Sequence, residues 1–228
     1  MAGLMVVIPA YQAAATIARV VDGARGSGLK VVVVDDGSSD GTAALAEAAG
    51  ATVLRHPGNR GKGAALQTGF AFCVRAGADA VLTLDADLQH DPAEIAALRA
   101  AHERAPEALV VGVRRFDEMP ARSRTGNRIS TYWISRFAGR PHQDTQSGFR
   151  VYPSALIGLG GLRSSHFDTE TELLLVAARR RIPLLEVPVR TIYAGATNHT
   201  HFRDFRDTLR IMRLVIGSPF WRDRAEPG

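Results

Sequence analysis

Cysteine is almost absent from this sequence, because Cys73 is the only one among 228 residues. One thiol cannot form a disulfide within the chain, so a secreted domain held together by disulfides is excluded and a reducing compartment is favoured. The sequence also lacks a cluster of cysteine and histidine residues that would indicate structural zinc. Because Cys73 lies in the apolar stretch GFAFCV, we expect its side chain in the core.

Long hydrophobic runs are also missing. No uncharged apolar stretch reaches the roughly 18 residues that indicate a membrane-spanning helix. The first residues, MAGLMVVIPAYQ, lack the basic region and the long apolar region of a signal peptide. We therefore expect a cytoplasmic protein that does not cross the membrane, and we leave open peripheral contact with the membrane's inner face.

The composition is that of a folded domain with a modest excess of basic residues. Hydrophobic residues make up 46% and charged residues 22%, so we expect a buried core and no extensive disorder. The net charge of +5 is compatible with a partner that carries phosphate. No linker or internal repeat divides the chain, and its length fits one domain, residues 1–228.

Strand-like and helix-like segments alternate along the first half of the chain. Apolar or β-branched runs predict strands within residues 3–10, 30–41, 51–58, 79–87, 108–115 and 182–193. Helical spacing predicts helices within residues 13–28, 42–50, 63–77, 91–106 and 169–181, with Asp91 as an N-cap and Pro92 at the first helical position. This order indicates an α/β fold with a mostly parallel central sheet flanked by helices. The long polar segment 116–150 is expected to carry function.

The predicted strands end in polar or acidic residues, where ligands gather in parallel sheets. The segment AVLTLDADLQHDP places Asp85 and Asp87 one residue apart after an apolar run. On an extended backbone both carboxylates share a face, and two such charges need a cation or hydrogen-bond donors to neutralise them. A solvated strand end at the start of a turn is the alternative. If the pair holds a metal, carboxylate oxygens favour Mg²⁺ or Mn²⁺.

Two other functional classes remain open from the residues alone. The segment GNRGKGAA does not satisfy the phosphate-binding loop pattern, and the GxGxxG dinucleotide motif is absent. A phosphotransfer or phosphatase enzyme could use the acidic strand ends, such as Asp35 and Asp36. A non-catalytic basic module would bind nucleic acid or anionic lipid without needing a metal.

Five segments in order resemble family 2 glycosyltransferases, most closely the polyprenyl-phosphate (dolichyl-phosphate) mannosyltransferase-like branch. They are VVDDGSSDGT, NRGKGAALQTGF, DADLQHDP, DTQSGFRVY and FDTETELL, with VPVRTIY following. The resemblance covers residues 4 to about 213 and implies a GT-A fold, a divalent ion and sugar transfer with inversion. It divides the domain into a nucleotide-sugar-binding half (1–115), an acceptor-binding half (116–204) and a basic amphipathic tail (205–228).

The resemblance also implies roles for individual residues. The ion would be held by Asp85, Asp87 and Gln89. The catalytic residues would be Asp87, as a metal ligand, and Asp144, which would orient the attacking oxygen or act as its base. The donor, a UDP- or GDP-linked sugar, would contact Pro9, Ala10, Tyr11, Asp36, Lys62, Asp85, Gln146, His199, His201 and Arg203. The acceptor, a polyprenyl phosphate, would contact Arg114, Arg124, Arg128, Ser147, Gly148 and Glu170, although Glu170 could instead pair with a loop arginine. We expect no nucleic-acid partner.

One departure from the family pattern affects the donor. The family usually continues its first strand end with Asn-Glu, whereas this chain has Gln12 and Ala13, so the choice of base is left open.

The tail has the pattern of a basic amphipathic helix. Apolar residues recur at helical spacing beside a row of arginines: Phe205, Leu209, Met212 and Ile216, with Arg206, Arg210 and Arg213. Such a helix can lie in a bilayer interface or pack on the sheet, and the pattern favours neither.

Overall fold

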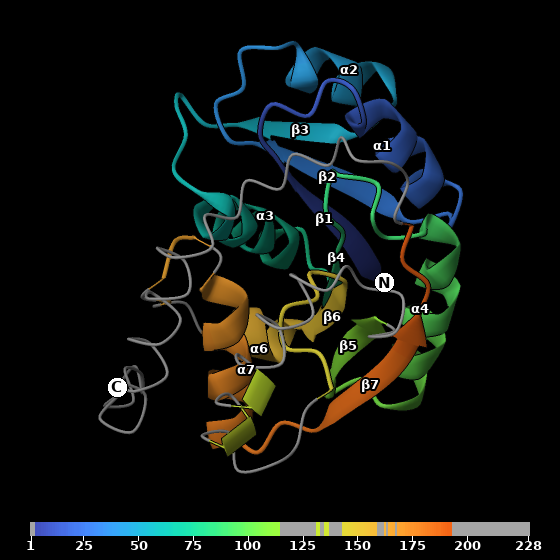
Figure 1. Cartoon of the computed structure of the whole chain (residues 1–228), viewed down its shortest axis with the longest axis vertical. Coiled ribbons are helices and arrows are strands. Elements are labelled where there is room, and N and C mark those ends of the chain that lie inside the picture. The colour runs from blue at the N-terminus through green and yellow to red at the C-terminus, as the bar shows by residue number, and fades with distance from the viewer. Residues whose placement is uncertain are drawn as a thin grey trace.

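The computed structural model describes residues 3–114, 131–132, 135–136, 143–158, 162, 164–166 and 168–192. Within this part of the chain, a seven-stranded sheet runs in the order β3-β2-β1-β4-β6-β5-β7 (Figure 1). Six strands point the same way, and β6 is antiparallel to both of its neighbours. The predicted α/β fold with a mostly parallel sheet is therefore confirmed.

The strands and helices follow the apolar runs of the sequence closely. The strands are β1 Leu4–Ala10, β2 Lys30–Asp35, β3 Thr52–Arg55, β4 Ala80–Thr83, β5 Leu109–Arg114, β6 Arg150–Pro153 and β7 Leu184–Val189. The helices are α1 Ile17–Arg25, α2 Thr42–Ala48, α3 Lys62–Arg75, α4 Ile95–Arg104, α6 Ser154–Ile157 and α7 Thr169–Arg179, with a 3-10 turn, η1, at Pro92–Glu94. Strand β6 and helix α6 are the two elements that we did not predict.

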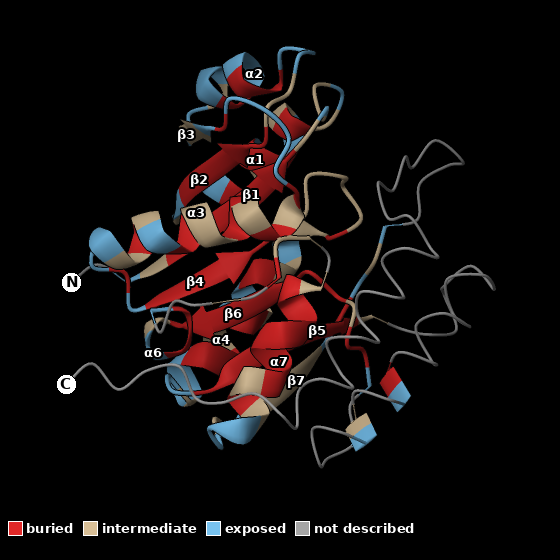
Figure 2. Cartoon of the chain, turned by 90° about the vertical axis from the view of Figure 1, so that its left-hand side faces the viewer, coloured by how far each residue is buried: buried red, intermediate tan, exposed pale blue. Residues whose placement is uncertain are grey.

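The sheet lies between two layers of helices because its strands are apolar on both faces. Alternate residues of β1 point to opposite sides, with Val6 and Ile8 facing α1 and α4 while Met5 and Val7 face α3 and α7. Figure 2 shows the buried strands between these helices. Cys73 packs in the α3 layer and is fully buried, as predicted, and burial raises the pKa of its thiol to about 11.

Helix α4 begins as the sequence indicates, but through a tighter turn. Asp91 accepts a hydrogen bond from the backbone N–H of Ala93 at 3.0 Å, and Pro92 occupies the first position of η1. The N-cap is thus confirmed, and the α-helix itself starts at Ile95. Among the described residues, the structure contains no helix long and apolar enough to cross a bilayer.

The start of α3 is packed directly against the segment that leads into α7. The backbone N–H of Ala64 donates to the carbonyl of Ser165 at 2.9 Å. A Cβ atom on Gly63 would lie 2.6 Å from the Ser165 carbonyl carbon and 2.7 Å from the His166 oxygen, and would also collide with Thr169 Oγ1. Only glycine fits here, and this close approach brings the two halves of the chain together.

We predict that Gly63→Ala destabilises the protein by about 1–3 kcal/mol, because the new methyl group must displace backbone atoms. Urea unfolding followed by circular dichroism measures the change. Gly58→Ala is the matched control, because no atom lies within 4 Å of a Cβ built there. Equal stability of the two variants would contradict the tight packing at Gly63.

Candidate active site

Two loops at the carboxyl ends of β1 and β2 are tied together by side-chain hydrogen bonds. Gln12 donates from Nε2 to Ser39 Oγ and accepts from the Ser39 N–H, each at 3.1 Å. Its backbone N–H donates to Ser38 Oγ at 2.9 Å, and its φ of 51° is held by these contacts. Asp40 accepts from the backbone N–H of Ala14 at 2.9 Å. The edge of the sheet above β1 and β2 is therefore pre-organised.

Asp36, at the end of β2, is buried and binds protein groups with both oxygens. It accepts hydrogen bonds from the backbone N–H groups of Arg60, at 3.0 and 3.1 Å, and of Gly61, at 2.7 Å. The His56 ring lies 2.6 Å from Asp36 Oδ1, and its other nitrogen lies 2.9 Å from Thr68 Oγ1. Asp36 thus fixes the loop that leads into α3, and its predicted contact with the nucleoside stays a prediction.

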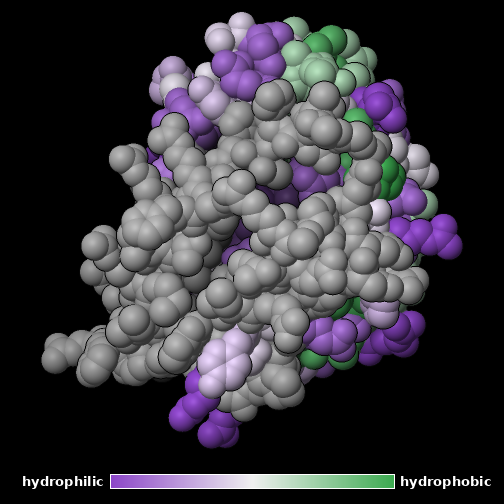
Figure 3. Space-filling view, viewed as in Figure 1, coloured by the Kyte–Doolittle hydropathy of each residue, from purple (hydrophilic) through white to green (hydrophobic). Residues whose placement is uncertain are grey.

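Our sequence analysis did not identify His56 as a partner of Asp36. The loop that follows His56, residues 57–60, is exposed. In Figure 3 hydrophilic side chains are visible at the upper left, on the β3 side of the sheet.

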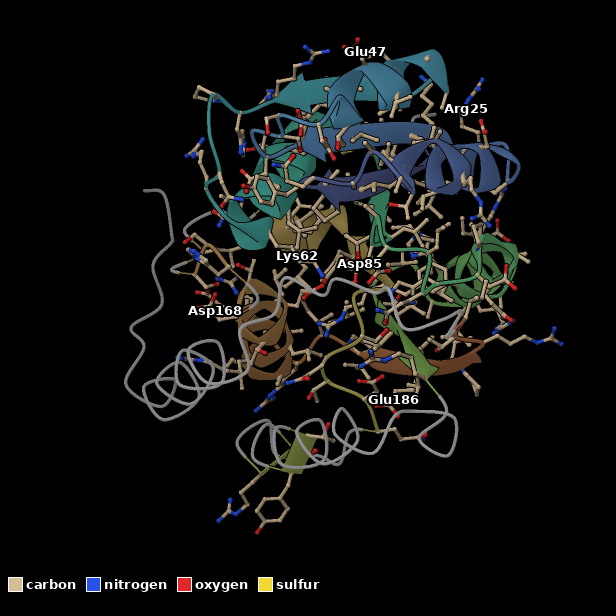
Figure 4. All side chains as sticks on the ribbon, turned by 45° about the horizontal axis from the view of Figure 1, so that its top comes forward. Arg25, Glu47, Lys62, Asp85, Asp168 and Glu186 are labelled. Atoms are coloured by element: carbon tan, nitrogen blue, oxygen red, sulfur yellow. The ribbon has the colours of Figure 1, made fainter. Side chains whose placement is uncertain are left out.

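Asp85 follows β4 and is neutralised by the chain itself. Its Oδ1 lies 2.7 Å from Lys62 Nζ, and its Oδ2 lies 3.5 Å from His90 Nε2. Figure 4 shows Lys62 and Asp85 facing each other at the centre of the molecule. Burial alone would raise the pKa of Asp85, but the Lys62 ammonium and the His90 ring outweigh it and hold that pKa well below its usual range.

Asp87 differs from Asp85 because no cationic side chain pairs with it among the described residues. Its Oδ1 accepts a hydrogen bond from the backbone N–H of Gln89 at 2.9 Å. Burial and the charge of Asp85 raise the pKa of Asp87 above its usual range. The two carboxylates of the motif are thus electrostatically distinct: Asp85 has a cationic partner, and Asp87 has none within the part of the chain that the structure describes.

The arrangement fits a divalent ion bound together with a phosphate ligand. Over the described ranges, the structure contains no group of three or more acidic, histidine or cysteine side chains that could hold a metal ion by themselves. Mg²⁺ in particular is commonly held by one or two carboxylates plus substrate phosphates. Asp87, with its raised pKa, is the carboxylate that a cation would stabilise most.

Lys62 connects the site to the start of helix α7. Its ammonium lies 3.2 Å and 3.4 Å from the two carboxylate oxygens of Glu170, in addition to the contact with Asp85. Burial alone would lower the pKa of Lys62, but the charges of Asp85 and Glu170 outweigh it and raise that pKa. We expected Lys62 to contact the donor, and Glu170 to contact either the acceptor or a loop arginine. In the structure, Lys62 and Glu170 form an ion pair with each other.

Residues 144–149, which belong to the predicted acceptor-binding half, approach the Asp85 side chain through Gly148. Thr83 Oγ1 donates to the carbonyl of Gly148 at 2.6 Å. A Cβ atom on Gly148 would lie 2.6 Å from Asp85 Oδ2, so a larger residue at this position would push the carboxylate away. Ser147 and Gly148 are buried, as are Pro9 and Ala10, while Tyr11, Gln89 and Gln146 are half-buried.

Asp144 is paired with Arg114 in the structure, and its predicted place near the attacking oxygen stays a prediction. Arg114, at the end of β5, donates from Nε to Asp144 Oδ2 at 2.7 Å and from Nη2 to Oδ1 at 3.1 Å. The Asp144 side chain is fully buried. Both carboxylate oxygens of Asp144 are thus engaged by one guanidinium in a bidentate pair. The guanidinium of Arg114, predicted to bind the acceptor phosphate, is likewise engaged with Asp144.

Arg150 is a structural centre that the sequence did not reveal. Its side chain is fully buried and donates three hydrogen bonds to backbone carbonyls: Nε to Ser147 at 2.7 Å, Nη1 to Glu170 at 2.8 Å and Nη2 to Thr145 at 2.8 Å. One side chain therefore fixes both the 145–147 segment and the first turn of α7.

Arg124, Arg128, His199, His201, Arg203 and the tail 205–228 lie outside the described residues. The chain that leads toward the 199–203 segment is anchored near the motif, because the N–H of Ile192 donates to the carbonyl of Gln89 at 2.8 Å and Thr191 bridges to His90.

Comparison with known proteins identifies several relatives. A family model described as "Glycosyl transferase family 2" matches residues 5–159. The UDP-N-acetylglucosamine–dolichyl-phosphate N-acetylglucosaminyltransferase of Methanococcus voltae is 30% identical over 94% of this chain and 96% of its own. The polyprenol monophosphomannose synthase of Mycolicibacterium smegmatis is 28% identical over 70% of this chain and 65% of its own.

Solved structures show the same architecture. Glucosyl-3-phosphoglycerate synthase from Mycobacterium tuberculosis, in complex with Mn²⁺, UDP and phosphoglyceric acid, has a TM-score of 0.76 at 21% identity. The match covers 97% of this chain and 80% of that one. At this identity the likeness concerns the fold.

The unpaired carboxylate generates a prediction about pH and stability. Folding raises the pKa of Asp87 above the ordinary aspartate value of about 3.9. Ionisation of Asp87 therefore destabilises the folded protein as the pH rises from the ordinary pKa through the raised pKa. In metal-free buffer at pH 7.5, Asp87→Asn should therefore melt at a higher temperature than the wild type, and the difference should shrink as the pH falls toward 4.

Differential scanning calorimetry in the presence of a chelator measures this difference. Asp22→Asn is the control, because Asp22 is an exposed carboxylate on α1. A gain that is independent of pH, or equal in both variants, would show that charge at Asp87 is not its cause.

Proposed function

The chain belongs to glycosyl transferase family 2, and we propose that it transfers a sugar from a nucleoside-diphosphate sugar to a polyprenyl phosphate. Membership makes the protein a glycosyltransferase with the GT-A fold, as the motifs predicted. The observation that carries the proposal is the pair Asp85 and Asp87 at the end of β4, one neutralised by Lys62 and one unpaired, beside the 144–149 segment.

The acceptor class is supported by the named relatives. They are a dolichyl-phosphate N-acetylglucosaminyltransferase and a polyprenol monophosphomannose synthase. A polyprenyl phosphate also suits the chemistry of the site. Its phosphate is already ionised at neutral pH, so it can attack the sugar without a general base, and displacement by a single attack inverts the anomeric centre.

Asp144 and Arg114 take a positioning role in this proposal. Their bidentate pair fixes the end of β5 to the 144–149 segment, since Asp144 also accepts a hydrogen bond from the Gln146 N–H at 3.1 Å. A hydroxyl acceptor would require a free base. The pairing of Asp144 with Arg114 therefore favours the phosphate acceptor over the hydroxyl alternative.

On the donor side, Asp87 is the principal metal ligand in our proposal, with Asp85 and Gln89 beside it. A bound Mg²⁺ or Mn²⁺ would supply a Lewis acid that neutralises the negative charge developing on the diphosphate leaving group. The Mn²⁺ and UDP named for the M. tuberculosis structure support this assignment. UDP is the donor nucleotide that the relatives favour, and GDP remains the alternative because Gln12 and Ala13 depart from the usual motif.

The position of the protein in the cell is part of the same proposal. A polyprenyl phosphate is dissolved in the bilayer, so its phosphate is met at the membrane surface. We propose peripheral contact at the cytoplasmic face, for which the 205–228 tail remains the predicted element.

The function predicts a lipid product. Purified protein incubated with Mn²⁺, a panel of radiolabelled UDP- and GDP-sugars and undecaprenyl or dolichyl phosphate should move label into the organic phase and release nucleoside diphosphate. Asp87→Ala should remain folded and lose this activity by about 100-fold or more. Removal of one group that stabilises the charge developing in the transition state commonly lowers the rate by that factor. Release of inorganic phosphate without labelled lipid would instead support the phosphotransfer alternative.

The pairing of Asp144 predicts how its loss affects the reaction. Asp144→Asn keeps the shape of the side chain but removes the charge that holds Arg114, so turnover should fall about tenfold or more while the KM for the donor changes little. Steady-state kinetics separate the two constants. A raised donor KM at unchanged turnover would place Asp144 on the nucleotide side of the site.

A further inference from the structure

Lys62 lies between carboxylates that come from two different parts of the chain. It is the first residue of α3, and its ammonium contacts Asp85 after β4 at 2.7 Å and Glu170 in the first turn of α7 at 3.2 Å. The Lys62 side chain is only 16% exposed and that of Glu170 only 6%. Water therefore screens these contacts much less than it would on the surface.

The Asp85 carboxylate is closely surrounded by the protein. Lys62 contacts one oxygen, His90 lies 3.5 Å from the other, and the space beside Gly148 is too small for a Cβ atom. A cation that approached Asp87 would meet the positive charge of Lys62 at the neighbouring carboxylate. It would also have to compete with Lys62 for Asp85.

We propose that Lys62 suppresses binding of the divalent cation to the free enzyme, so that the ion enters the site together with the donor diphosphate. This inference rests on the proposed function. Without nucleotide, the ion finds one unpaired carboxylate and a nearby ammonium. With nucleotide, the diphosphate supplies further oxygen ligands and negative charge, which outweigh the repulsion from Lys62.

Glu170 adjusts the strength of this effect. It shares the ammonium with Asp85, and its position is fixed because Arg150 Nη1 donates to the Glu170 carbonyl at 2.8 Å. A residue of the predicted acceptor half thereby determines how firmly Lys62 holds Asp85. The charge of Glu170 in the first turn of α7 is therefore coupled through Lys62 to Asp85 at the proposed metal site.

Binding of Mn²⁺ alone tests the proposal without measuring catalysis. The electron paramagnetic resonance signal of free Mn²⁺ is titrated with each protein, with and without UDP. Wild type should bind Mn²⁺ weakly alone and more tightly with UDP. Lys62→Met should bind Mn²⁺ alone about tenfold more tightly, because a repulsive charge is lost and Asp85 is released. Lys62→Arg keeps the charge and should bind Mn²⁺ alone as weakly as the wild type.

A double variant separates release of Asp85 from a general change in charge. Lys62→Met combined with Glu170→Met removes one charge of each sign, so the local net charge is unchanged while Asp85 loses its partner. Replacing a buried ion pair by apolar residues is commonly tolerated, so this variant also serves if Lys62→Met alone does not fold. It should bind Mn²⁺ alone more tightly than the wild type. Circular dichroism confirms folding of each variant.

The outcomes distinguish this inference from the proposed function. Tight binding of Mn²⁺ by the wild type without UDP, or no gain in the folded Lys62 variants, would overturn the inference while leaving glycosyl transfer intact. Failure of wild type to bind Mn²⁺ even with UDP or GDP would count against the metal-dependent function itself, and the inference would fall with it.

Discussion

A carboxylate withdrawn from water must find a counter-charge or hydrogen-bond donors, and this constraint organises the catalytic edge of the sheet. Parallel strands place Asp36 and Asp85 at one edge of the sheet, the segment before β6 adds Asp144, and each carboxylate is neutralised differently. Asp36 accepts hydrogen bonds from backbone N–H groups and contacts a histidine ring. Asp85 pairs with a lysine ammonium, and Asp144 pairs with an arginine guanidinium. Each partner comes from another segment, so neutralising the charges also joins the loops.

These contacts make the fold and the site inseparable. Lys62 and Glu170 are 108 residues apart, yet their ion pair lies beside the D-x-D motif. Arg150 holds the same first turn of α7 through a carbonyl, and Gly63 permits α3 to approach that turn closely. The predicted nucleotide-sugar-binding half and the predicted acceptor-binding half therefore share one charged cluster, in which Glu170 contacts Lys62 beside Asp85.

The sequence predicted the parallel strands and a candidate site at their carboxyl ends, but few of the contacts that the structure shows there. Apolar runs reveal β1, β2 and β4 because buried parallel strands are apolar on both faces. Strand β6 escaped prediction because it has four residues, begins with Arg150 and ends with Pro153, and is defined by antiparallel pairing with β4 and β5. Pairs such as His56 with Asp36 depend on tertiary contacts, and no local spacing encodes them.

Among the described residues, Asp87 has no cationic partner, and this difference from its neighbours is informative. Every other acidic group at this edge that we have discussed gains donors from the chain, whereas Asp87 has one backbone N–H and a like charge two residues away. A protein built only for stability would pair or remove such a carboxylate. In our proposal, the counter-charge that Asp87 lacks among the described residues arrives with the ligand, as a divalent ion bound together with the donor diphosphate. On that proposal the unpaired member of the motif, rather than the motif as a whole, lies at the reactive end of the site.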